Sequence, residues 1–251
     1  GDPEAFGALL KAATRAGRAI CPDCEFAFGA PFFHSQAING HIPFLELVQA
    51  AHPDLADYYD AMGFHPYPMY PPKAPPEGDP DLGEWAFWEM VDGVRAVMAQ
   101  QGAETRPFWA TELGWPVFGE VDENQQAAYL VRGFLHLIQL GVSPVCWYNL
   151  MEGEDPGGFP PEDAFGLMRY GDPLGENPPQ PKPAFHALKQ LGNRFGEFWI
   201  ETDFRVEGGL PEGVLGYALS DARNQEWWVL WTHLQSDPVE VELPHPPLEV
   251  L

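Results

Sequence analysis

Short apolar segments alternate with longer amphipathic ones over residues 2–195, and this alternation constrains the fold more than any other feature. The apolar segments cover residues 25–30, 58–65, 107–112 and 142–149, and each has the length and composition of a buried strand. The segments around them, residues 2–20, 44–51, 85–101, 122–141 and 184–195, carry helix-capping residues or apolar side chains at helical spacing. Strands that alternate with helices form parallel sheets with right-handed crossovers. The sequence therefore predicts an α/β domain with four parallel strands.

The pattern changes after Gly196. Residues 198–204, 213–219, 226–232 and 239–243 have the composition of short strands and are separated by turn residues. We therefore expect a small, β-sandwich-like antiparallel module that the chain does not complete, and we divide the chain into residues 1–197 and 198–251. Trp227, Trp228 and Trp231 alternate imperfectly along one of these strands, so we assign them to the core of the module rather than to a binding surface.

Charge and composition exclude several classes of partner. The formal net charge of -24 and the isoelectric point of about 4.4 disfavour nucleic acid and anionic membranes. No apolar run reaches transmembrane length. Aromatic residues make up 14% of the chain, which fits either a large core or a sugar-stacking cleft. The chain begins at Gly1 rather than Met, so its compartment, secreted or cytoplasmic, stays undetermined.

Three cysteines are too few to indicate a disulfide framework. Cys21 and Cys24 have the spacing of a redox pair or half of a zinc site, but no second such pair exists in the chain. We therefore expect them to be two small apolar residues in a tight turn. Cys146 lies inside an apolar segment, and we expect it to be buried.

Three consecutive predicted strands end in polar or aromatic side chains. Glu112 ends the strand at 107–112, His65 ends the strand at 58–65, and Trp147 and Asn149 lie at the end of the strand at 142–149. In a (β/α)-barrel the carboxyl ends of the parallel strands meet at one rim, where catalytic groups sit. We therefore expect these side chains to share one site.

Glu112 is the side chain at this rim that is hardest to explain by packing, because an uncompensated buried carboxylate is costly. Since side chains alternate along a strand, we expect Phe108 and Ala110 to share its face. A carboxylate nucleophile, hydrogen-bond donors around it and an aromatic stacking surface are the requirements of glycoside hydrolysis. The alternative is a solvated glutamate that lies beside a loop.

Four motifs carry a resemblance to a known group of enzymes. Phe-Trp-Ala-Thr-Glu-Leu-Gly-Trp, Phe-His-Pro-Tyr-Pro, Trp-Tyr-Asn-Leu and Phe-Gly-Leu-Met-Arg…Pro-Lys-Pro-Ala-Phe resemble the C-terminal half of a clan A retaining glycoside hydrolase, most closely the β-xylosidase/α-L-iduronidase-type family or related cellulase-like barrels. The resemblance covers residues 2–195 and implies strands 5 to 8 of a (β/α)8 barrel. It implies that Glu112 is the nucleophile and that His65, Tyr67 and Trp147 are the barrel residues around it. The small β module resembles the β domain of such enzymes.

The departure from the clan pattern concerns the general acid/base. That residue is a glutamate at the end of the fourth strand, usually in an Asn-Glu-Pro motif, and this chain has no Asn-Glu-Pro. Glu4 lies in a predicted helix and does not inherit the role. We therefore expect a piece of a longer enzyme, whose N-terminal half-barrel is its missing partner and which is inactive by itself.

Further predicted substrate contacts are Asn149, Trp115 and His34, although Trp115 fits the packing of a lid equally well. The expected substrate is a β-linked or plant or bacterial polysaccharide-derived glycoside, and no cofactor or metal is implied. The sugar, the linkage and the exo or endo mode stay open. One alternative is a non-catalytic carbohydrate-binding relative, and a weaker one is a metal-dependent hydrolase that uses His34, His41 and His65.

Overall fold

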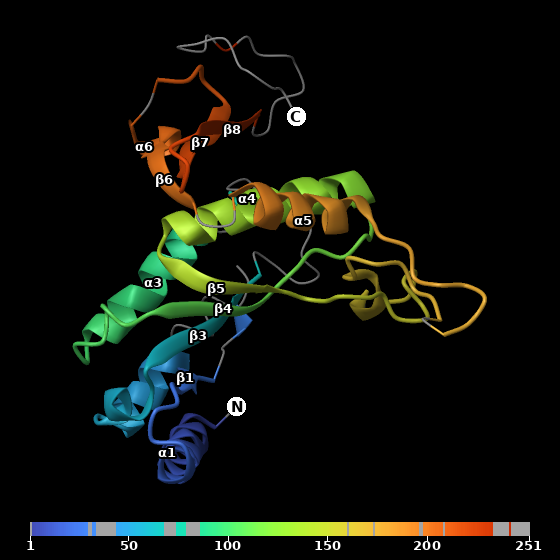
Figure 1. The fold of residues 1–251 in the computed structure, drawn as a ribbon. Coiled ribbons are helices and arrows are strands. Elements are labelled where there is room, and N and C mark those ends of the chain that lie inside the picture. The colour runs from blue at the N-terminus through green and yellow to red at the C-terminus, as the bar shows by residue number, and fades with distance from the viewer. Residues whose placement is uncertain are drawn as a thin grey trace. The chain divides into compact units, whose positions relative to one another are not determined.

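The computed structural model describes residues 2–29, 32–33, 44–67, 74–78, 86–159, 161–172, 174–195, 198–207, 209–232 and 241. The chain divides into two compact units, Gly1–Lys189 and Gln190–Leu251. The first unit holds a parallel sheet with helices, and the second holds an antiparallel sheet (Figure 1).

The parallel sheet of the first unit confirms the predicted α/β fold. Its strands are β1 (Ala27–Phe28), β2 (Phe32–Phe33), β3 (Ala61–Pro66), β4 (Phe108–Leu113) and β5 (Val142–Trp147). The order is β1-β3-β4-β5, β2 also pairs with β3, and every pair is parallel. The strand predicted at residues 58–65 begins later, at Ala61, because Leu55–Tyr58 forms a turn of 3-10 helix before β3.

Two of the helices, α1 and α4, begin where their capping residues predict. The unit contains α1 (Pro3–Ile20), helical residues 44–51, α3 (Phe87–Ala99) and α4 (Glu123–Gln139), and α5 (Pro183–Phe195) follows. Asp2 Oδ1 accepts hydrogen bonds from the backbone of the first turn of α1, and Asp122 Oδ1 does the same for α4. Gly141 follows α4 with a φ of 75°, a conformation that favours glycine.

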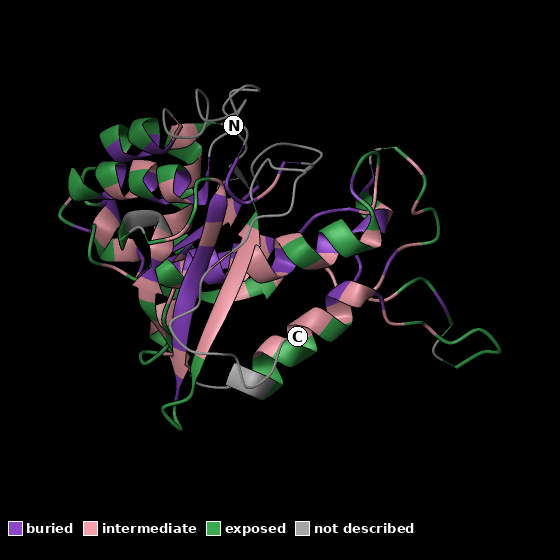
Figure 2. Ribbon diagram, turned by 90° about the horizontal axis from the view of Figure 1, so that it is seen from above, coloured by how far each residue is buried: buried purple, intermediate pink, exposed green. Residues whose placement is uncertain are grey.

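The two faces of the parallel sheet have different environments (Figure 2). Side chains on one face join the helices in the core; they include Phe28, Met62, Phe64, Phe108, Ala110 and Val142, packed with Val91, Val94 and Leu137. Along β4 the opposite face carries Trp109, which is half-buried, and Thr111, which is exposed. Sequence analysis put Phe108 and Ala110 on the face of Glu112. That prediction is wrong, because a register shift between Ala110 and Leu113 interrupts the alternation before Glu112.

Both cysteine predictions need correction. Cys21 and Cys24 form a disulfide, with their Cα atoms 5.4 Å apart. The tight turn was predicted correctly: α1 ends at Ile20, and the Cys24 amide donates to the Cys21 carbonyl at 3.2 Å, so the turn itself brings the two thiols together. Cys146 is exposed rather than buried, because it lies on β5, at the end of the described strand order.

The second unit contains β6 (Phe198–Asp203), the short helix α6 (Phe204–Glu207), β7 (Val214–Asp221) and β8 (Glu226–Thr232). These strands form an antiparallel sheet in the order β6-β7-β8, which confirms three of the predicted strands. The fourth, residues 239–243, lies outside the described residues except for position 241. In the described ranges no helix is long and apolar enough to cross a membrane.

Candidate active site

Glu112 lies at the carboxyl end of β4, within contact of two residues from the end of β3. The Tyr67 hydroxyl donates a hydrogen bond of 2.8 Å to Glu112 Oε1. His65 Nδ1 lies 3.2 Å from Glu112 Oε2, and the two side chains are only 22% and 30% exposed. Glu112 and His65 are thus together, as their positions at strand ends predict, and Tyr67, which the resemblance places beside them, joins them.

Strand pairing explains this convergence. β3 and β4 run parallel in the register Phe64 to Ala110, so the residues after these positions emerge at the same edge of the sheet. His65 is in the last two residues of β3, and the Tyr67 amide then donates to the His65 carbonyl at 2.9 Å in a tight turn. This turn points the Tyr67 side chain, which is 2% exposed, back to Glu112.

Burial fixes the protonation of both partners of Glu112. Desolvation, together with the hydrogen bond to Glu112, raises the pKa of Tyr67 far above its ordinary value, so its phenol stays protonated as a donor. Desolvation lowers the pKa of His65 even though the nearby Glu112 carboxylate opposes this shift. His65 is therefore a neutral imidazole at neutral pH. No lysine or arginine in the described part of the chain forms an ion pair with Glu112.

Tyr148 is a residue of this site that sequence analysis missed. Its pKa is raised by burial and then by the carboxylates of Glu162 and Glu112, which places its phenol within electrostatic reach of both. The Tyr148 and Tyr67 rings both pack edge-on against Phe165, with centroids 5.3 and 6.2 Å away. The sequence did contain a signal for Tyr148. Side chains alternate along an extended chain, so Trp147 and Tyr148 point to opposite faces.

The two predicted tryptophans lie on the helix side of the sheet. Trp115 is fully buried, with its ring between those of Phe87 and Trp147 at centroid distances of 6.0 and 6.2 Å, and its indole nitrogen donates to the Ala74 carbonyl. Full burial contradicts the prediction that Trp115 contacts a sugar. Trp147 is half-buried against the same core and donates to the Phe165 carbonyl at 3.2 Å. Its contact with a sugar stays a prediction.

Of the remaining predicted site residues, the structure describes only Asn149. Asn149 is half-buried and its side chain hydrogen-bonds Tyr148, while its buried Oδ1 has no hydrogen-bond partner. His34, and His41 of the metal alternative, lie outside the described residues. Within the described ranges no three histidine, cysteine, aspartate or glutamate side chains are close enough to hold a metal ion.

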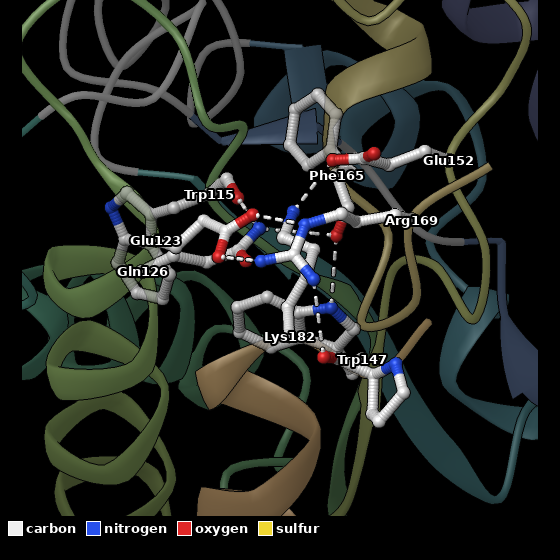
Figure 3. A network of polar contacts seen from close by, with 9 residues as sticks. Trp115, Glu123, Gln126, Trp147, Glu152, Phe165, Arg169 and Lys182 are labelled. Carbon is white, nitrogen blue, oxygen red and sulfur yellow. Dashed lines mark hydrogen bonds and ion pairs between the residues drawn. The ribbon is translucent and has the colours of Figure 1, made fainter. Parts of the chain in front are cut away.

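A polar network behind the site holds the long segment that follows β5 (Figure 3). The Gln126 amide on α4 donates to the carbonyls of Trp115 and Phe165, at 2.7 and 3.3 Å. The Phe165 carbonyl also accepts from Trp147, so two donors fix the backbone that carries the Phe165 ring. Through the Phe165 ring, which contacts Tyr67 and Tyr148, this segment takes part in the site.

Two ion pairs anchor the same segment. Lys182 Nζ donates to Glu152 Oε1 at 2.8 Å, and the two side chains are 0% and 9% exposed. Arg169 makes a bidentate pair with Glu123 at the start of α4. Both pairs join residues far apart in sequence, so they hold the segment in one conformation.

The solved structures that this chain resembles are glycoside hydrolases. No protein-family model matches the chain, and no curated protein sequence matches it significantly. A family 39 glycoside hydrolase from the gut symbiont Bacteroides cellulosilyticus WH2 matches with a TM-score of 0.65 and 20% identity, over 96% of this chain and 47% of that one. A family 39 β-xylosidase from Caulobacter crescentus matches with a TM-score of 0.51 and 21% identity, over 87% of this chain and 43% of that one.

The chain thus spans about half the length of these structures. At such identities the likeness establishes the fold. It agrees with the resemblance drawn from the four sequence motifs and with the observed parallel sheet, flanking helices and separate antiparallel sheet. The chain has the fold of about half of a (β/α)8 barrel, like that of the glycoside hydrolases it matches, followed by a small antiparallel β module.

Proposed function

We propose that this chain is the C-terminal half of a retaining glycoside hydrolase, with Glu112 as its nucleophile. The observation that carries the proposal is the contact of the Glu112 carboxylate with the Tyr67 hydroxyl and the His65 imidazole at the carboxyl rim of the sheet. A phenol that donates to one carboxylate oxygen limits the rotation of the side chain. The carboxylate is then held for attack without an ion pair that would reduce its nucleophilicity.

The reaction has two displacements. A Glu112 oxygen forms a bond to the anomeric carbon as the bond from that carbon to the leaving oxygen breaks, and the leaving oxygen takes a proton from a general acid. Water then attacks the anomeric carbon of the glycosyl ester, loses a proton to the same group acting as base, and releases the Glu112 carboxylate. No described residue is assigned the acid/base role, and we place it in the other half of the barrel.

The neighbouring side chains would bind the sugar. The neutral His65 imidazole and the Tyr148 phenol offer hydrogen bonds beside Glu112, and Asn149 has an unpartnered oxygen near Tyr148. His34 remains a predicted sugar contact. The substrate class, a neutral β-linked glycoside, follows from the resemblance and from an acidic chain that would repel anionic sugars.

Covalent trapping tests this proposal directly. The full-length polypeptide that contains this chain should react with 2-deoxy-2-fluoro glycosides of xylose or glucose, and peptide mass spectrometry should find the glycosyl ester on Glu112. Glu112→Gln should abolish labelling, while Glu162→Gln, at a second acid near Tyr148, should preserve it. Turnover of an aryl glycoside without an adduct on Glu112 would contradict the assignment. Binding without turnover or labelling would favour the non-catalytic alternative.

A further inference from the structure

The Phe165 side chain lies where the ends of three strands meet at the candidate active site. Its ring packs edge-on against Tyr67, which follows β3, and against Tyr148, which follows β5. It also lies against Gly114, which follows β4: a Cβ atom on Gly114 would be 2.9 Å from Phe165 Cδ1 and 2.1 Å from the Tyr148 carbonyl oxygen. Glycine is therefore required for these segments to pack this closely. One ring thus contacts the ends of β3, β4 and β5, and β4 is the strand that carries Glu112.

Phe165 is only 1% exposed, but it lies outside the main apolar core. Among the described residues that core includes neither Phe165 nor Tyr67. Both belong to a small aromatic cluster at the rim, in which Tyr67 also packs edge-on against His65, with ring centroids 6.5 Å apart. Small satellite clusters of this kind form beneath long loops. The burial of Phe165 therefore orders the rim, where the Glu112 carboxylate lies, rather than the packing of helices on the sheet.

The backbone on both sides of Phe165 is tied to the segments that follow β4 and β5. The Val117 amide donates to the Ala164 carbonyl at 3.0 Å, and the Leu167 amide donates to the Asn149 carbonyl at 3.1 Å. The Phe165 carbonyl itself accepts two side-chain hydrogen bonds (Figure 3). The ring is thus attached to a backbone that is held on every side, which is the requirement for a side chain that positions another one.

The position of the Tyr67 ring determines where its hydroxyl points. The hydroxyl is the far end of a long side chain, so a small tilt of the ring moves it away from Glu112 Oε1. In an active site a misplacement of about 1 Å costs roughly 100-fold in rate. The edge-on contact with Phe165, at 6.2 Å between centroids and 80° between ring planes, is a preferred aromatic geometry and opposes such a tilt.

We propose that Phe165 is a positioning residue for the nucleophile: its ring holds Tyr67 so that the phenol donates to Glu112 Oε1. The effect on rate rests on the proposed function, in which Glu112 attacks the sugar. The long segment that follows β5 thereby acts on Glu112 through a single side chain, and its ordering becomes a condition for a correctly held carboxylate.

A double-mutant cycle tests whether Phe165 acts through the Tyr67 hydroxyl. In the full-length polypeptide that contains this chain, Phe165→Leu should slow the labelling of Glu112 by a 2-deoxy-2-fluoro glycoside roughly tenfold. In the Tyr67→Phe background the same substitution should slow labelling by less than about twofold, because no hydroxyl is left to misplace. Equal slowing in both backgrounds would overturn the proposal.

Phe28→Leu is the matched control for this cycle. Phe28 is 2% exposed, belongs to the main apolar core and packs against Tyr59 rather than Tyr67. The same loss of a buried ring there should leave the labelling rate of the folded protein unchanged, with or without the Tyr67 hydroxyl.

Urea unfolding gives a second measurement that needs no turnover. Tyr67→Phe should lower the free energy of unfolding less in the Phe165→Leu background than in the unmodified protein, because the hydrogen bond to Glu112 is already weakened there. In the Phe28→Leu background it should have its full effect. If the unmodified protein is not labelled at all, the proposed function fails, and the unfolding cycle still decides the role of Phe165. Equal losses in the Phe165→Leu background and in the unmodified protein would overturn that role.

Discussion

Tyr67 and Glu112 are 45 residues apart in sequence, yet the phenol donates a 2.8 Å hydrogen bond to the carboxylate at the rim of the sheet. The bond involves a charged acceptor and a nearly buried donor, and hydrogen bonds to charged groups contribute about 1.5–3 kcal/mol. Its removal therefore provides the sharpest test of the site.

Tyr67→Phe should lower kcat/KM of the proposed full-length glycoside hydrolase by about 10- to 100-fold, because the phenyl ring keeps the packing and only the donor is lost. The variant should still unfold cooperatively, at a lower temperature because the same hydrogen bond stabilises the fold. Tyr170→Phe is the control, since it removes a hydroxyl that bonds the exposed Glu154. Unchanged turnover in Tyr67→Phe would show that the contact has no role in the reaction.

Glu112→Ala should lower the chemical rate of the proposed full-length glycoside hydrolase by several orders of magnitude, because it removes the proposed nucleophile. Added azide should restore part of the activity and give a glycosyl azide of inverted configuration, since a small anion can occupy the space of the carboxylate. Product analysis by NMR decides the configuration. Near-normal turnover without azide would eliminate Glu112 as nucleophile.

The buried pair Lys182–Glu152 should be important for folding. Lys182→Met leaves the Glu152 carboxylate buried without its partner, so we expect a loss of about 3–5 kcal/mol in the free energy of unfolding. Arg169→Met breaks the pair with Glu123, in which Arg169 is 47% exposed, and should cost no more than about 1 kcal/mol. Urea unfolding of both variants measures the contrast, and equal losses would refute it.

Glu77 should make the first unit sensitive to acid. Burial alone would raise its pKa, but hydrogen bonds from His136 and Arg132 outweigh this and lower the pKa to about 2, from 4.5. A depressed folded-state pKa stabilises the fold above pH 4.5, and this contribution is lost as the pH falls toward 2; at about 1.36 kcal/mol per unit it amounts to about 3 kcal/mol.

Chemical unfolding between pH 2 and 6 measures this dependence. In Glu77→Gln the slope of the unfolding free energy against pH should become shallower over that interval, because the titrating group is gone. Glu104→Gln, at an exposed position, is the control and should keep the slope of the unmodified protein. An identical slope in both variants would show that another group causes the acid sensitivity.

The cysteines can be counted by their reactivity. Without reductant, a maleimide should label one thiol per chain, the exposed Cys146, because Cys21 and Cys24 are joined. After reduction and unfolding, all 3 cysteines should react. Intact mass spectrometry measures the number of labels per chain before and after reduction. Labelling of three thiols in the unreduced protein would contradict the disulfide.

Local sequence patterns determined the secondary structure of this protein. Asp2 and Asp122 mark helix starts because their carboxylates satisfy the free amides of the first turn, and Gly141 ends a helix because it adopts a positive φ. The order of strands and helices followed from the same short-range signals. Glu112 and His65 could be assigned to one rim because parallel strands end together.

Tertiary structure decided what each side chain faces. A register shift in β4 separated Glu112 from the alternation of Phe108 and Ala110, and an alternating pattern contains no sign of such a shift. Trp115 was expected at the sugar, but it is fully buried in the core on the helix side, and the half-buried Trp147 packs against it, while Tyr148 lies at the site. Packing between distant segments makes these choices, because burying large rings outweighs any preference that local sequence expresses.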